Sequence, residues 1–427
     1  MIHRLRLAVL IGGLWLAACA NPGNPPSSAL EAPASHWVAS WGTAQQIPEP
    51  HNALPAEQFR DASLRQIVRL SLGGETLRVR ISNAFGTAPL QISNASVAKA
   101  LAPGRADVDA ASLQPLRFGG KAGVIIPAGA EYSSDVLSLA HAPLTDLAVT
   151  LHLPLAPEQQ TGHPGSRTTS FVRQGNHVLT ASWPAVHKVV RWYNLSAVEV
   201  RAARGVGAVV ALGDSITDGN GSTTDGNDRW TDFLATRLVA DSARSGAPAL
   251  AVINAGVGGG RLLKDGLGPN LVARFERDVL LRPGRTHAIV LIGVNDIGVL
   301  HRNKDDSPER RSALIEEMKE GYRQIVRRAH AHGVCVLGGT ILPFMGSTWY
   351  QPSADTEADR QTINQWIRNA GVFDTVIDFD AAVRDPARPQ HLHPAFDSGD
   401  HLHLSPKGYS AMADALPLSA LRHCKLR

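Results

Sequence analysis

The spacing of hydrophobic and polar residues changes near residue 205. Before that point, apolar side chains take every second position in segments such as 64–72 and 77–82, which predicts strands with one buried face. Gly73 and Gly74 between these two segments favour a hairpin. The pattern predicts an antiparallel, sandwich-like β-rich domain over residues 36–200. Other short strand-type segments lie at residues 92–98, 123–126, 147–153 and 186–192.

From residue 205 onward, short apolar segments alternate with segments of helical period. This alternation predicts an α/β domain over residues 201–427, doubly wound around a five-stranded, mainly parallel sheet. The functional site of such a sheet lies at the carboxyl ends of its strands. The predicted strands cover residues 207–212, 250–254, 287–292, 334–342 and 376–379. The predicted helices cover residues 230–240, 271–281, 307–332, 356–369 and 406–421.

The first 35 residues predict export and a tether. A short basic region precedes an apolar segment at residues 7–18, which is too short to span a bilayer, so residues 1–19 are interpreted as a signal peptide. The segment ends in Leu-Ala-Ala-Cys, which resembles the bacterial lipobox and would make Cys19 a lipidated first residue. Cleavage after Ala20 is the alternative. Residues 20–35 are interpreted as a flexible tether. We expect a cell-envelope lipoprotein, otherwise a periplasmic or secreted protein, that meets a membrane only through its lipid.

Composition narrows the classes of partner. The 427 residues carry a formal net charge of only +4, and Lys and Arg are scattered rather than clustered. We therefore expect no nucleic-acid partner. Cys335 and Cys424 are left to pair or to remain free, and oligomeric state stays open. Six aromatic residues of the first half could pack in the core or form a sugar-stacking platform, and packing is the favoured interpretation. They are Trp37, Trp41, Phe85, Trp183, Trp192 and Tyr193.

Four polar segments occur where the predicted sheet should hold its site. They cover residues 213–215, 254–261, 293–296 and 400–405. The first follows a strand and carries Ser215, whose hydroxyl is a poor nucleophile until a base removes its proton. His403 is the candidate base, because imidazole titrates near neutral pH. Asp400 lies three residues earlier and can hold the second ring nitrogen.

The same segments offer hydrogen-bond donors for an oxyanion. The backbone N–H groups of Ser215 and Gly259 and the side-chain amide of Asn295 could stabilise the charge that forms when a carbonyl is attacked. The Gly-rich segment lacks the Lys-Ser/Thr ending of a phosphate-binding loop. His391, His393, His401 and His403 do not have a recognised zinc spacing. We therefore predict neither a cofactor nor a metal.

Together the four segments resemble the signature blocks of the SGNH, or GDSL, hydrolase superfamily. Gly-Asp-Ser, Asn-x-Gly-x-Gly-Gly, Gly-x-Asn-Asp and Asp-x-x-His-x-Ser occur in the family's order. The resemblance implies a flavodoxin-like, three-layer α/β/α fold with Ser215 as nucleophile, His403 and Asp400 as the acid–base pair, and Gly259 and Asn295 as oxyanion donors. The sequence around residues 213–230 and 295–298 also looks like a branch of secreted bacterial esterases and arylesterases associated with xylan degradation.

The expected function is that of an exported serine esterase. It would act through an acyl-enzyme on a small-molecule or glycan ester with a short acyl group, such as an acetylated carbohydrate or an aryl ester. Two alternatives stay open. One is a surface carbohydrate-binding protein with an inactive hydrolase half. The other is a lipid acylhydrolase, thioesterase or amidase of the same superfamily, because pocket shape decides acyl and leaving-group preference.

Overall fold

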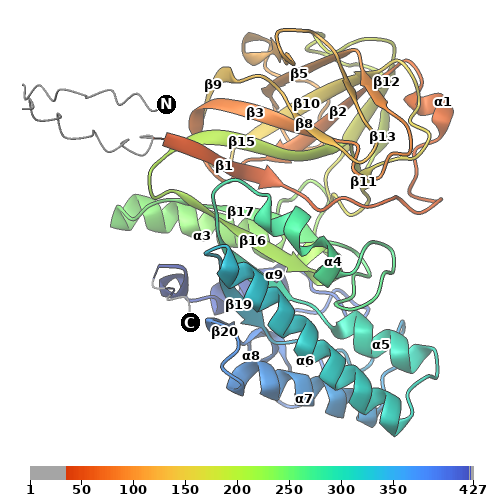
Figure 1. Cartoon of the computed structure of the whole chain (residues 1–427), viewed down its shortest axis with the longest axis vertical. Helices are drawn as coiled ribbons and strands as arrows, with labels where there is room; N and C mark the ends of the chain where they lie inside the picture. The colour runs from red at the N-terminus through yellow and green to blue at the C-terminus, as the bar shows by residue number, and fades with distance from the viewer. Residues whose placement is uncertain (1–34, 423, 425–427) are drawn as a thin grey trace, which may run out of the picture. The chain divides into compact units, whose positions relative to one another are not determined.

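Residues 207–377 contribute a five-stranded sheet in which every pair of neighbouring strands is parallel, as expected. In this computed structural model, which describes residues 35–422 and 424, the strand order is β17-β16-β18-β19-β20 (Figure 1). This is the 2-1-3-4-5 order of flavodoxin-like sheets, whose topological switch point lies at the first strand. The strands are β16 (Gly207–Gly213), β17 (Leu250–Gly256), β18 (Arg285–Leu291), β19 (Cys335–Gly339) and β20 (Thr375–Ile377).

The helices of this half form two groups by contact. α3, α8 and α9 pack on one another in one group, and α4 to α7 do so in the other. Two of them begin at a serine cap that precedes a proline: Ser307 and Ser405 each accept a backbone hydrogen bond. The helices are α2 (Ser215–Asp218), α3 (Trp230–Ser245), α4 (Leu271–Phe275), α5 (Val294–Arg302), α6 (Pro308–Ala331), α7 (Ala354–Asn369), α8 (Phe379–Val383) and α9 (Pro406–Ala415), with a π turn at Glu276–Leu280 and a 3₁₀ turn at Leu418–Leu421.

The first half of the described chain consists of antiparallel sheets. One contains β1 (Ser35–Gly42), β15 (Leu195–Ala203), β3 (Gly74–Ser82), β8 (Glu131–Ser133) and β9 (Leu137–His141). The other contains β13 (His187–Val189), β12 (Ser170–Gln174), β2 (Ala62–Arg69), β10 (Asp146–Leu153), β5 (Asn94–Lys99) and β6 (Gln114–Pro115). Smaller elements are the pairs β4 (Leu90–Ile92) with β7 (Val124–Ile126) and β11 (Gly162–His163) with β14 (Trp192–Tyr193), the short helix α1 (Ala56–Phe59) and the 3₁₀ turn Ala110–Ser112.

The hairpin predicted at Gly73 and Gly74 is wrong. The strands on either side, β2 and β3, belong to different sheets, so the connection crosses between sheets. Both flanking strands have the expected period-two pattern, and the partner of each strand is set by packing beyond the turn. Gly73 is still required by close approach, because a Cβ there would lie 2.8 Å from the carbonyl oxygen of His141.

Most of the aromatic residues of the first half are core residues, as favoured. Trp41, Trp183, Trp192 and Tyr193 are buried. Trp41 and Trp192 meet edge to face with ring centroids 5.0 Å apart. The remaining two, Trp37 and Phe85, each lie under an arginine guanidinium. The sugar-stacking platform is therefore not formed by these rings.

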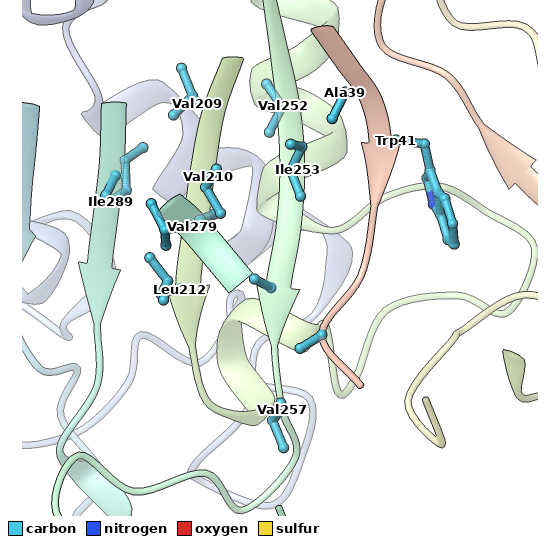
Figure 2. Packing of buried hydrophobic residues seen from close by; sticks show 14 of the residues in the cluster. Ala39, Trp41, Val209, Val210, Leu212, Val252, Ile253, Val257, Val279 and Ile289 are labelled. Atoms are coloured by element: carbon cyan, nitrogen blue, oxygen red, sulfur yellow. The ribbon is translucent and has the colours of Figure 1, made fainter. Parts of the chain in front are cut away.

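The two halves share one hydrophobic core. Ala39 of β1 lies beside Val252 and Ile253 of β17, as Figure 2 shows, and Trp41 belongs to the same core. Ser71 covers the free edge of β17, because its hydroxyl accepts a hydrogen bond from the Val252 N–H at 3.0 Å. The described residues form a single compact unit. The division into domains at residue 200 stays a prediction, with β15 ending at Ala203 and β16 beginning at Gly207.

Three further features bear on the sequence predictions. Cys335 and Cys424 are joined in a disulfide with Cα atoms 6.3 Å apart, which settles the pairing left open. Among residues 35–422 and 424, no helix is long and apolar enough to cross a bilayer. The predicted signal peptide, Cys19 and nearly all of the predicted tether lie outside the described residues.

Candidate active site

A tight turn at the end of β16 presents Ser215. Gly213 closes the strand, where a Cβ would lie 2.5 Å from the carbonyl oxygen of Leu291. Asp214 caps α2, its carboxylate accepting the Ile216 N–H at 3.0 Å. Ser215 is the first residue of α2, so its own N–H has no acceptor within the helix. The turn leaves both the hydroxyl and the N–H of Ser215 free to act outside the helix.

Ser215, His403 and Asp400 form a continuous hydrogen-bonded chain. Ser215 Oγ lies 2.7 Å from His403 Nε2, and His403 Nδ1 lies 2.5 Å from Asp400 Oδ2. The other oxygen of Asp400 accepts the backbone N–H groups of Leu402 and His403. Partial burial opposes ionisation of Asp400, but its hydrogen bonds and its charge interaction with His403 hold the pKa of this carboxyl well below its usual range. An ionised Asp400 fixes the ring with Nδ1 protonated, which leaves Nε2 to accept the serine proton.

Asn295 has a fixed amide orientation. It lies in the first turn of α5, a helix that is not among those predicted from the sequence. This helix begins directly after Gly293 (φ 124°) without a polar cap. Asn295 Nδ2 donates to the carbonyl oxygen of Gly260 at 2.7 Å, and the hydroxyl of Tyr350 donates to Asn295 Oδ1 at 2.5 Å. A carbonyl oxygen can only accept, so these two bonds determine which end of the amide is nitrogen. The second hydrogen of Nδ2 stays available to a ligand.

Gly259 lies in the same pocket as Ser215 and Asn295. Its φ is +64°, in the left-handed region that favours glycine, and a Cβ would lie 3.0 Å from Leu267. The pocket has a volume of about 390 Å³. Its lining is formed by Arg167, Ser215, Asn220, Gly258, Gly259, Leu267, Asn295, Thr348, Trp349, Tyr350, Asp400, Leu402 and His403.

All residues predicted for the catalytic triad and the oxyanion hole therefore line one pocket. The predicted lipidation site, Cys19, lies outside the described residues. Sequence reasoning missed four others: Arg167, Asn220, Arg274 and Tyr350. The amide nitrogen of Asn220 lies 3.1 and 3.2 Å from the two ring nitrogens of His403. Asn220 and Arg274 are near recognised segments, but Arg167 and Tyr350 belong to loops with no periodic pattern. Only their contacts in three dimensions reveal them.

Arg274 supports the strand ends from below. Its side chain is fully buried and donates to two carbonyl oxygens. One belongs to Gly213, the last residue of β16, and the other to Ala255, the residue before the last of β17. It also pairs with buried Asp278 at 2.8 Å. Burial alone would raise the pKa of Asp278, but the neighbouring guanidinium groups of Arg277 and Arg274 lower it. This pair fixes the spacing between the serine turn and the glycine loop.

Two buried carboxyl groups are adjacent in sequence to residues of the site: Asp214 precedes Ser215, and Asp296 follows Asn295. Burial raises the pKa of Asp214 to about 7, and proximity to the second carboxyl, Asp296, adds to the effect. Burial likewise raises the pKa of Asp296 to about 6, although its carboxylate accepts the N–H groups of Leu262 and Leu263. Asp296 thus anchors the segment that follows the glycine loop.

One group of metal-ligand side chains occurs among residues 35–422 and 424. It comprises His287, Cys335 and Cys424. The two sulfurs are bonded to each other in the disulfide, so they offer no thiolate. His391 and His393 are half-buried loop residues and belong to no such group in this described part of the chain.

Comparison with known families places this site in context. Residues 211–411 match the model of the GDSL-like lipase/acylhydrolase family. This segment, which is just under half of the chain, is similar to GDSL-like hydrolases. It carries the serine turn, the glycine loop, α5 and the His403 segment described above. A search of curated proteins found no match.

Solved structures similar to this chain align with about half of it. A GDSL-like lipase from Bacteroides thetaiotaomicron is 18% identical, covering 50% of this chain and 88% of its own, with a TM-score of 0.34. The lipase/acylhydrolase from Enterococcus faecalis is 21% identical, covering 52% and 98%, with a TM-score of 0.36. The acetylxylan esterase Axe2 from Geobacillus stearothermophilus is 19% identical, covering 49% and 91%, with a TM-score of 0.36. The similarity to the GDSL-like family is therefore limited to residues 211–411.

Proposed function

We propose that this protein is a serine esterase whose nucleophile is Ser215. The observation that carries the proposal is the chain of short hydrogen bonds from Ser215 through His403 to Asp400. The similarity of residues 211–411 to a family of lipases and acylhydrolases supports ester chemistry.

The geometry suggests a two-step reaction. Ser215 Oγ attacks the ester carbonyl while His403 Nε2 takes its proton, and the protonated ring then gives this proton to the leaving alkoxide. A water molecule, activated by the same ring, releases the acid from the acyl-enzyme and regenerates the serine. Asp400 orients the ring throughout and stabilises its charged form.

Three donors would stabilise the oxyanion of each tetrahedral intermediate. They are the N–H groups of Ser215 and Gly259 and the free amide hydrogen of Asn295, all at the same pocket. Loss of one such donor in other enzymes costs about 3–4 kcal/mol of transition-state stabilisation. Gly258 lines the pocket beside Gly259 and could share the role.

The size of the pocket favours small esters as substrates. Many of its lining residues are polar or glycine, while Leu267, Leu402 and the rings of Trp349 and Tyr350 give it apolar surface of limited extent. Such a lining fits the short acyl group of an acetylated carbohydrate or an aryl ester better than a long lipid chain, which needs an extended apolar groove.

Replacing the serine tests the proposal. The Ser215→Ala variant should lose about 10⁴-fold or more of kcat/KM on 4-nitrophenyl acetate, because no other hydroxyl takes its place. Ser419→Ala, which removes an exposed serine, serves as the matched control and should retain wild-type activity. Turnover by Ser215→Ala at the wild-type rate would reject Ser215 as nucleophile. A folded wild-type protein without any esterase or thioesterase activity would favour the inactive binding protein instead.

We also propose that the protein works outside the cytoplasm. The disulfide between Cys335 and Cys424 supports this, because such bonds persist in oxidising compartments. The basic and apolar start of the sequence, ending at Cys19, supports export with lipid attachment. Mass spectrometry of the mature amino terminus should find a diacylglyceryl group on Cys19. An unprocessed Met1 in the purified protein would contradict export.

A further inference from the structure

An arginine from the β-rich half reaches the proposed active site. Arg167 lies between β11 and β12, outside the GDSL-like segment, yet it lines the same pocket as Ser215 and His403. Apart from His403, the charged side chains in the lining are those of Arg167 and Asp400. The first half of the chain thus contributes a cation directly to the pocket.

Among residues 35–422 and 424, the guanidinium of Arg167 has no hydrogen-bond acceptor and no ion-pair partner. Its Nε is fully covered and has no acceptor. Arg229, in the same region, instead binds Asp232 and the carbonyl oxygen of Ser166. Covering a charged donor without an acceptor costs free energy. An anionic ligand at the two terminal nitrogens, which are not covered in this way, would compensate the charge.

Hydrogen bonds to Asp225 fix the backbone at Arg167 and at nearby Thr169. The φ of Arg167 is +49°, which is unfavourable for a residue with a Cβ. Its carbonyl oxygen accepts the N–H of Asp225 at 2.9 Å, and the carboxylate of Asp225 accepts the N–H and hydroxyl of Thr169. The strained conformation is therefore maintained by contacts with the loop that follows Ser215. A side chain presented at this cost is suited to a binding role.

We propose that Arg167 binds a carboxylate carried by the ester substrate. A guanidinium presents a planar fork of N–H donors that matches a carboxylate, and bonds of this type are short and strong. Asp400 does not compete for this fork, because its oxygens are engaged by His403 and by backbone N–H groups. The inference rests on the proposed esterase function and narrows its substrates to esters with an acidic group near the scissile bond.

The acidic group could belong to the acyl part or to the alcohol part, and two pairs of matched esters separate these sources. For the acyl part, mono(4-nitrophenyl) glutarate is compared with 4-nitrophenyl pentanoate. For the alcohol part, 4-acetoxybenzoate is compared with its methyl ester. The quantity measured in each pair is the ratio of kcat/KM for the anionic ester to that for the neutral ester.

In at least one pair this ratio should fall by about 10- to 100-fold in Arg167→Met, the range expected for losing a charge-assisted hydrogen bond. Arg167→Lys should keep part of the preference, because it retains the charge and loses the fork. Lys121→Met removes an exposed cation away from the pocket and should keep the wild-type ratio. In the wild type, the ratio should also fall as salt rises from 50 to 500 mM, a readout that does not depend on how the variants fold.

An unchanged ratio in both pairs for a folded Arg167→Met overturns the role of Arg167 and leaves the esterase proposal standing, because the neutral esters are still hydrolysed. Failure of the wild type to hydrolyse any of the four esters overturns both.

Discussion

At the scale of single residues, the orientation of one amide decides whether Asn295 can serve an oxyanion. Tyr350 donates to its oxygen and the Gly260 carbonyl accepts from its nitrogen, so the amide cannot turn over without losing both bonds. Burial raises the pKa of Tyr350, which keeps the phenol protonated and able to donate at any working pH. Tyr350 is thus a positioning residue for Asn295.

Removing this hydroxyl should lower turnover more than binding. We expect Tyr350→Phe to reduce kcat on 4-nitrophenyl acetate about 10-fold with little change in KM, because the amide then loses its fixed direction at a cost of about 1–1.5 kcal/mol. Steady-state kinetics measures both constants. Tyr132→Phe, at an exposed tyrosine of β8, is the control. Equal kcat values for Tyr350→Phe and the wild type would show that the Tyr350 hydroxyl does not position Asn295 for catalysis.

The sequence identifies residues that belong to spaced motifs and misses those that do not. Each predicted catalytic or oxyanion residue of this kind follows a predicted strand or precedes a predicted helix, namely Ser215, Asn295, Asp400 and His403. Because the site of a parallel sheet lies at the carboxyl ends of its strands, the sequence predicts that these residues lie at one edge. Their chemical roles stay predictions. Tyr350 and Arg167 lie in loops, where side-chain placement depends on long-range packing that no local pattern records.

At the scale of elements, the turn from β16 into α2 buries a carboxyl group beneath the serine. Asp214 accepts the Ile216 N–H and is almost fully buried. Its folded pKa of about 7 exceeds the unfolded value of about 3.9. The folded state therefore holds the proton more tightly, and stability from this group is complete below pH 4 and is lost as pH rises through 7.

The Asp214→Asn variant should remove this loss, because the amide oxygen can still accept the Ile216 N–H and cannot ionise. The free energy of unfolding of Asp214→Asn relative to wild type should rise between pH 4 and pH 8. About 4 kcal/mol is the upper limit set by three pKa units. Urea denaturation across this range measures the difference. Parallel pH profiles for the two proteins would show that Asp214 does not ionise with a raised pKa.

Strands and helices with a regular spacing of hydrophobic residues are predicted well, whereas the connections between them are not. The five parallel strands and the long helix α6 follow from hydrophobic spacing and caps. The hairpin at Gly73 and Gly74 is wrong, because two adjacent glycines permit a turn without deciding which sheet each strand joins. Helix α5 was missed, because it begins at a glycine with positive φ rather than at a polar cap.

At the scale of the whole molecule, the β-rich half is part of the structure that surrounds the proposed site. His163 of β11 lies 2.8 Å from Asp218 of α2, and both side chains are almost fully buried. Buried Arg282 donates to the carbonyl oxygens of Thr43 and Ser196. The shared core and these buried bonds couple the two halves.

The described unit should therefore unfold in one step. Calorimetry should show a single transition, and His163→Ala should move that transition to lower temperature without splitting it, since it leaves buried Asp218 without a partner at a cost of about 3 kcal/mol. Two separate transitions, or a shift of one part alone, would mean that the halves are independent domains.

The proposed mechanism requires Ser215 to be the residue that becomes covalently modified. The direct measurement is peptide mass spectrometry after reaction with an aryl phosphonofluoridate, which traps a serine activated by a neighbouring imidazole. We expect one adduct per chain, on the peptide that contains Ser215, formed much more slowly in His403→Ala and absent in Ser215→Ala. A stoichiometric adduct on any other residue, or full inactivation with Ser215 unmodified, would contradict the account.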